Sequence, residues 1–209
     1  LGINTLDMDQ TIYTLLMNPR ADVHATICQT ATENLDILPA NIDLSAAEVQ
    51  LVNEVARESA LARVLRHVEA EYDVILIDCQ PSLGLLAVNA LTAAHGVIVP
   101  VEAEFFALRG VALLVETIET VRDRINPRLK IDGIVATMVD LRTLHSREVL
   151  ERLQEAFGDL IFDTRIGRTI KFPDASVATE PIISYAPNHA GAHAYRRLAR
   201  EIIARGDAA

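Results

Sequence analysis

The sequence predicts an α/β fold in which helices flank a mainly parallel, doubly wound sheet. Three short apolar runs, at residues 74–77, 96–101 and 131–138, are typical of strands buried on both faces. Segments with helical length and period separate these runs, and such alternation favours a parallel sheet. Ligands bind beyond the carboxyl ends of the strands in these folds, so the residues that follow each run are the first candidates for a site.

Local signals place the remaining elements. A helix over residues 11–17 ends at Asn18 and Pro19, and residues 34–38 fit a short strand. Ser45 and Glu48 form a capping-box pattern, which predicts a helix from Ser45 to about residue 68. The apolar pattern predicts further helices at residues 83–94, 107–125, 146–157 and 190–204, and a further strand at residues 160–164.

The composition is that of a globular domain. The chain has 209 residues, half of them hydrophobic, which favours a single domain over residues 1–209. No apolar run is long enough to span a membrane and no signal-peptide pattern is present, so we expect a cytoplasmic protein. Cys28 and Cys79 match no metal-ligand spacing and are expected to be reduced thiols. The net charge of −10 argues against a surface that is basic throughout, but it leaves room for a local basic patch.

Asp78 directly follows the apolar run 74–77, at the predicted carboxyl end of a strand. A carboxylate in this place is unfavourable unless a cation, water or backbone donors meet it. One interpretation is a Walker-B-type acid that helps to hold Mg²⁺ beside nucleotide phosphates through coordinated water. The other is a turn or helix-capping aspartate, which is common in α/β proteins. The local pattern alone leaves both interpretations open.

The residues around Asp78 favour the first interpretation. The segment YDVILIDCQPSLGLLAVNAL resembles the Walker B region of the ParA/Soj/MinD family of deviant P-loop ATPases. Further blocks resemble the same family in the same order: NIDLSAAEVQL, VPVEAEFFALRG, GIVATMVDLRT and PIISYAPNHAGAHAYRRLAREI. The resemblance covers the chain from about Ile3 onward and is nearest to the Soj-like branch of chromosome partition.

The chain also departs from this family. The family begins with a strand, a KGGVGKT-type phosphate loop and a helix, followed by a second strand, and these do not occur here. No G-x-x-x-x-G-K-[ST] pattern is present, so the chain lacks the amide cradle and the lysine that such a loop offers to phosphates. We therefore expect the carboxy-terminal majority of a ParA-like ATPase domain, truncated at its amino-terminal side and unable to hydrolyse ATP by itself. Gln80 and Gly167 stand where the family usually has proline.

The resemblance implies a site for ATP and Mg²⁺ and a homodimer that forms on ATP binding. Asp78 matches the acid beside Mg²⁺, whereas Met138, Gly167 and Arg168 match the region that flanks adenine. Nonspecific DNA binding, a ParB-like partner and a nucleoid-associated location are implied as well. Such DNA binding needs only clustered arginine or lysine side chains that reach phosphates. The candidates are Arg165, Arg168, Lys171, Arg196, Arg197 and Arg200.

Alternatives remain. One is a degenerate, non-catalytic family member that binds protein partners; it is disfavoured because the run 74–77 then has no strand beside it. Another is a MinD-like ATPase of septum placement at the membrane. The arginines of 190–204 also fit a solvated helix face. His189 and His193 stand four apart, as metal ligands do, but no third ligand converges, so a surface or capping role is favoured.

Overall fold

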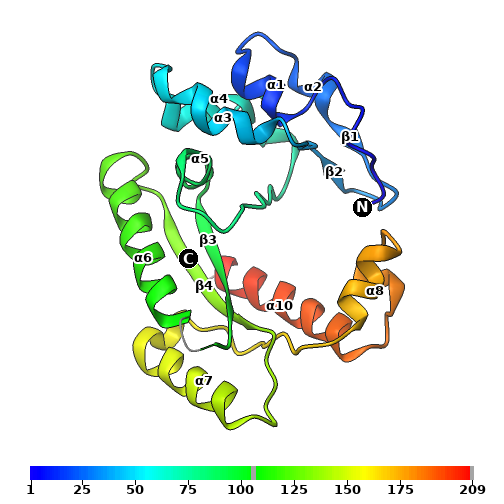
Figure 1. Ribbon diagram of the computed structural model, residues 1–209, viewed down its shortest axis with the longest axis vertical. Coiled ribbons are helices and arrows are strands. Elements are labelled where there is room, and N and C mark those ends of the chain that lie inside the picture. The colour runs from blue at the N-terminus through cyan, green and yellow to red at the C-terminus, as the bar shows by residue number, and fades with distance from the viewer. Residues whose placement is uncertain (105–106, 208–209) are drawn as a thin grey trace. The chain divides into compact units, whose positions relative to one another are not determined.

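Two parallel strands, β3 (Gly96–Glu102) and β4 (Lys130–Thr137), are the longest strands of the described chain (Figure 1). The computed structural model describes residues 1–104 and 107–207. Phe105 and Phe106 of the VPVEAEFFALRG block therefore lie outside the described residues. Contacts divide the chain into two units, Leu1–His95 with Glu119–Leu129 and Gly96–Ile118 with Lys130–Ala209, and each unit is described by itself. The single domain expected from composition stays a prediction.

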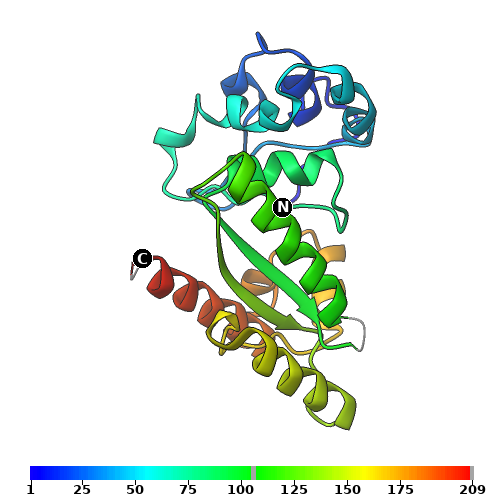
Figure 2. The same ribbon diagram turned by 90° about the vertical axis from the view of Figure 1, so that its left-hand side faces the viewer.

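The β3–β4 pair confirms two of the predicted strands. Gly96 lies opposite Lys130 and Glu102 opposite Thr137, and the strands run side by side (Figure 2). Residues 160–164 were expected to form a third strand here, but they make only isolated bridges to β4. The Phe162 amide donates to the Ile134 carbonyl at 2.9 Å, and Ile134 bridges to Ile161.

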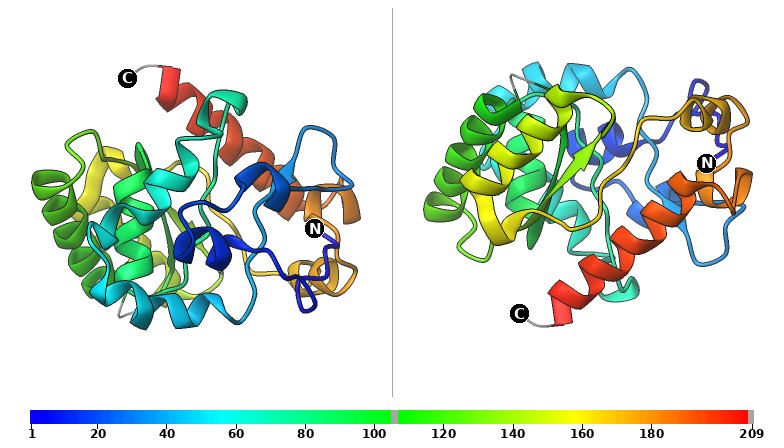
Figure 3. Two further views of the ribbon diagram at one scale, coloured as in Figure 1. Left: turned by 90° about the horizontal axis from the view of Figure 1, so that it is seen from above. Right: turned by 90° about the horizontal axis from the view of Figure 1, so that it is seen from below.

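Helices cover both faces of this strand pair (Figure 3). Side chains alternate between the two faces of a strand, so each face has its own core. α6 (Ala107–Arg124) and α7 (Leu144–Phe157) contribute to the core that contains Val99 and Ile134, whereas α10 (Ala190–Asp207) packs with Ile98 and Val135. Helices on both faces of a parallel pair confirm the predicted α/β class. α8 (Lys171–Val177), α9 (Ile182–Tyr185) and a 3-10 turn, Gly158–Leu160, complete the unit.

The other unit is mainly helical. Its core is formed largely by apolar residues of its helices, among them Leu15, Leu51, Leu61 and Ala90. Its strands, β1 (Cys28–Gln29) and β2 (Asp36–Ile37), form a short antiparallel pair, so the strand expected at residues 34–38 is present in shortened form. The helices are α1 (Ile12–Met17), α2 (Val23–Thr26), α3 (Leu44–Gln50), α4 (Ala60–Leu65) and α5 (Leu85–Ala93), with 3-10 turns at Leu51–Asn53, Arg57–Ser59 and Glu69–Glu71. Across residues 1–104 and 107–207, no helix combines the length and apolar character that a bilayer crossing requires.

The capping box predicted at Ser45 and Glu48 is wrong. The Ser45 hydroxyl donates to the Ile42 carbonyl at 2.8 Å, and the predicted long helix is interrupted at Ala56, which has a φ of 52°. The Glu48 carboxylate instead accepts from the Leu85 and Leu86 amides, at 2.8 and 3.1 Å, and so satisfies free donors at the start of α5. A Cβ on Gly84 would lie 2.6 Å from a Glu48 oxygen, so a larger residue there would displace this carboxylate from the two amides.

The strand predicted at residues 74–77 does not form. Val74 is 70% exposed and Leu76 is 82% exposed, and no strand of the described residues pairs with this run. A run that is apolar on both faces becomes a buried strand only when neighbouring strands bond to its backbone and helices cover it. The described strands of its unit, β1 and β2, pair with each other and give no such neighbour.

Candidate functional site

Asp78 lies on the exposed stretch that follows residues 74–77. Within residues 1–104 and 107–207, no hydrogen bond or ion pair engages its carboxylate, and no cluster of three metal-ligating side chains surrounds it. Burial raises the pKa of the neighbouring Cys79 thiol, and the Asp78 charge raises it further. Because residues 74–77 form no strand, the expected position of Asp78 at the carboxyl end of a strand is wrong, and its role beside Mg²⁺ stays a prediction.

The three residues predicted beside the base lie together at the carboxyl end of β4. The Val139 amide donates to the Ile166 carbonyl at 3.1 Å, and the Arg168 amide donates back to the Val139 carbonyl at 3.1 Å. These bonds hold Met138, which precedes Val139, close to Gly167 and Arg168. Parallel α/β sheets bind ligands at this end of their strands.

Met138 has an unusual backbone conformation. Its φ is 52°, in the left-handed region that favours glycine, and its side chain is 42% exposed. Strained residues of this kind cluster at ligand-binding sites, where the surrounding structure holds them in place. The conformation turns the chain at the end of β4 into the loop that carries Asp140.

Asp140 is a member of this group that the sequence patterns did not single out. Its two carboxylate oxygens accept from the Arg142 guanidinium at 2.9 and 2.7 Å, and one also accepts from the Arg142 amide at 3.1 Å. The Arg142 guanidinium, then the Arg142 amide and the Arg168 charge, lower the pKa of Asp140 to about 2. The signal in the sequence was an acid and an arginine two residues apart just beyond an apolar strand.

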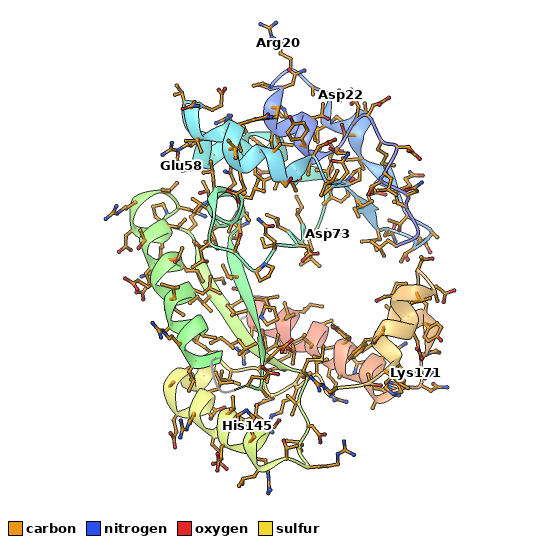
Figure 4. The ribbon with its side chains drawn as sticks, in the orientation of Figure 1. Arg20, Asp22, Glu58, Asp73, His145 and Lys171 are labelled. Atoms are coloured by element: carbon orange, nitrogen blue, oxygen red, sulfur yellow. The ribbon has the colours of Figure 1, made fainter. Side chains whose placement is uncertain are left out.

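The six candidates for DNA contact fall into two groups. Lys171 pairs with Asp174 at 3.0 Å, which raises the lysine pKa, and Arg196 donates to the Pro187 and Ile183 carbonyls at 2.7 and 3.1 Å. These two side chains therefore have partners within the protein; Figure 4 labels Lys171. The remaining four side chains are exposed and form no hydrogen bond or ion pair within the described residues: Arg165, Arg168, Arg197 and Arg200.

Comparison with known proteins finds relatives that include chromosome-partitioning proteins. The family model described as "AAA domain" matches residues 1–131. The sporulation initiation inhibitor protein Soj of Bacillus subtilis is 42% identical over 206 residues, which cover 99% of this chain and 81% of Soj. The chromosome partitioning protein ParA of Caulobacter vibrioides is 41% identical over 207 residues, 98% of this chain and 77% of that protein. An uncharacterized protein of Mycobacterium tuberculosis is 56% identical over 205 residues, which are 98% of this chain and 64% of that protein.

Solved structures agree with the fold. A structure titled cobyrinic acid a,c-diamide synthase from Mycobacterium smegmatis, with a bound ATP analog and magnesium, has a TM-score of 0.81 and 37% identity, and the match covers 94% of this chain and 73% of that one. The cell division ATPase MinD of Pyrococcus furiosus, at 23% identity, shares the fold with a TM-score of 0.74, over 94% of this chain and 76% of that one.

The match to the AAA-domain model and the named relatives place the chain among ATPases of the ParA type, and Met138, Gly167 and Arg168 lie beyond the end of its strand β4. Its relatives narrow that class. The chain belongs to the ParA/Soj family of chromosome-partitioning ATPases. It spans 64% of the length of the Mycobacterium tuberculosis relative, so it corresponds to a part of that protein.

Proposed function

We propose that this chain is most of the ATPase domain of a nucleotide-switched partition protein that segregates a chromosome or a plasmid. ATP binding joins two copies, the dimer binds DNA without sequence preference, and a ParB-like partner stimulates hydrolysis and release. The observation that carries this proposal is 42% identity to Soj over 81% of the length of that protein. The strand-end residues support it, since acidic, basic and strained groups gather where this fold class binds ligands.

The chain supplies two parts of the proposed nucleotide site. In one unit, Asp78 would help to hold a hydrated Mg²⁺ ion; in the other, Met138, Gly167 and Arg168 would contact the base. A bound Mg²⁺ ion supplies charge neutralisation at the phosphates. The phosphate-binding amides and lysine are the part that this sequence does not contain. The bound ATP analog and magnesium in the Mycobacterium smegmatis structure support this choice of ligands.

The first test concerns Asp78. In a form of the protein that carries a phosphate-binding loop before Leu1, Asp78→Ala should lower the ATP turnover by at least about tenfold, because one side of the metal site is lost. The matched control is Asp73→Ala, since Asp73 is an exposed aspartate of the same stretch (Figure 4). Phosphate release by both variants gives the comparison. Equal turnover in the Asp78 variant and the unsubstituted protein would show that the role proposed for Asp78 is wrong.

The second test concerns DNA. Removing Arg197 and Arg200 together should weaken ATP-dependent binding to random-sequence duplex DNA. The slope of log K against log salt concentration should fall by the equivalent of about two phosphate contacts. The control removes Arg147 and Arg152, which are exposed on α7. Binding is measured by fluorescence anisotropy across a salt titration. An unchanged salt slope after loss of Arg197 and Arg200 would place the DNA contacts elsewhere.

A further inference from the structure

The mainly helical unit has a small hollow between α1, α4 and the loop that follows α1. Its volume is about 220 Å³. Its lining includes apolar residues of the core of this unit: Leu15, Leu16, Val23 and Ala60 are each no more than 6% exposed. None of the residues placed at the nucleotide or DNA sites lines it. It is therefore a separate feature from the proposed nucleotide and DNA sites.

The rim of this hollow is basic. Arg63, Arg66 and His67 line it, and no aspartate or glutamate does. This is unusual in a chain with 29 acidic and 19 basic residues. Arg66 and His67 are exposed, and their side chains form no hydrogen bond or ion pair within the described residues. Arg20 lies between the lining residues Pro19 and Ala21, and its side chain points outward from the loop (Figure 4).

Asp22 and Glu71 have other partners, whereas the exposed Glu69, two residues after His67, lies outside the lining. Asp22, which is labelled beside Arg20 in Figure 4, accepts from the His24 amide at 2.9 Å and so caps α2. Glu71 lies 3.7 Å from the His24 imidazole. Neither of these carboxylates belongs to the lining, so the charge of the rim is not neutralised by the residues that form it.

We propose that this hollow docks an acidic, amphipathic peptide segment of a partner protein. One apolar side chain of the partner enters the hollow, and carboxylates beside it pair with Arg66, whose guanidinium is exposed at the rim. Size supports this occupant, because pockets for small ligands usually measure about 300–1,000 Å³, whereas a single anchoring side chain needs less room. Charge supports it too, since complementary charges at the rim of an interface raise the association rate and select the partner.

The experiment uses the whole chain and a designed probe. The probe is a fluorescein-labelled peptide with leucines at i, i+3, i+4 and i+7 and glutamates at most other positions; its counterpart has lysines in place of the glutamates. Fluorescence anisotropy should show micromolar binding of the acidic peptide and much weaker binding of the basic one. Arg66→Glu should weaken binding by about tenfold or more. Arg128→Glu is the control, since Arg128 is exposed in the same unit and does not line the hollow.

A second variant tests the apolar part of the site. Ala21→Leu should fill the hollow without a change of charge and so reduce peptide binding. Thermal unfolding of this variant, compared with the unsubstituted chain, checks that the fold is retained. The proposal is overturned if Arg66→Glu and Arg128→Glu weaken binding equally, or if the basic peptide binds as well as the acidic one. Displacement of the peptide by duplex DNA would also overturn it, because the surface would then be one for nucleic acid.

Discussion

Replacing Phe162 by alanine should lower the free energy of unfolding by about 3–5 kcal/mol, because a large, fully buried ring is lost and a cavity remains. Phe162 is 1% exposed and packs in the core that α10 shares with β4. The ring occupies the space over Gly133, where a Cβ would lie 2.5 Å from a ring carbon. The Arg205 guanidinium covers the ring at 4.2 Å from its centroid and donates to the Ile161 carbonyl at 2.8 Å.

Urea unfolding followed by circular dichroism measures this loss. Phe162→Leu is the graded control and should lose less, since leucine refills part of the space. Tyr185→Ala tests whether the loss of any aromatic ring gives the same effect. Tyr185 is 37% exposed, so its replacement should lower the free energy of unfolding much less. A loss below about 1 kcal/mol for Phe162→Ala would mean that this core relaxes around the cavity.

Asn89→Leu should lower the free energy of unfolding by about 2–4 kcal/mol, although leucine has nearly the same shape as asparagine. Asn89 lies on α5 and is 1% exposed. Its side chain accepts from the Leu61 amide at 3.1 Å and donates to the Arg57 and Leu85 carbonyls at 2.8 and 2.9 Å. Leucine at this position leaves the Leu61 amide and the Arg57 carbonyl without their side-chain partner, at the place where α4 begins.

Thermal and denaturant unfolding of the Asn89 variant give the measurement. Asn53→Leu is the matched control, because Asn53 is exposed in the same unit and its side chain forms no hydrogen bond within the described residues. An equal effect of the two substitutions would contradict the role assigned to the buried amide. Partial recovery in Asn89→Asp, which can still accept from the Leu61 amide, would separate that bond from the two donated ones.

The strands that the sequence predicted correctly are those for which the described chain contains a strand to pair with. β3 and β4 bond to each other, and each has apolar side chains for both faces. The run 74–77 has the same apolar pattern but forms no strand, because an apolar pattern does not show whether other strands are present to pair with it. The Glu48 error is of the same kind: Glu48 matched a local capping pattern, whereas its real partners, Leu85 and Leu86, lie 37 and 38 residues away.

The candidate site was predicted to a similar extent. The resemblance named Met138, Gly167 and Arg168, which the structure brings together beyond the end of β4, whereas Asp78 follows a run that forms no strand. Sequence patterns could not show that Arg196 bonds to two carbonyls, because spacing on a helix identifies a face and not a partner. α8 and α9 were missed because neither has a strong apolar period.

The exposed run at residues 74–77 also has a consequence for solubility. Four consecutive β-branched or leucine side chains without charge form the kind of segment from which chains stack into aggregates. Asp73 and Asp78 stand directly at its two ends, and charges in these positions oppose such stacking. Asp78 thus serves as a gatekeeper as well as a candidate metal-side acid, and Asp73 shares only the first of these roles.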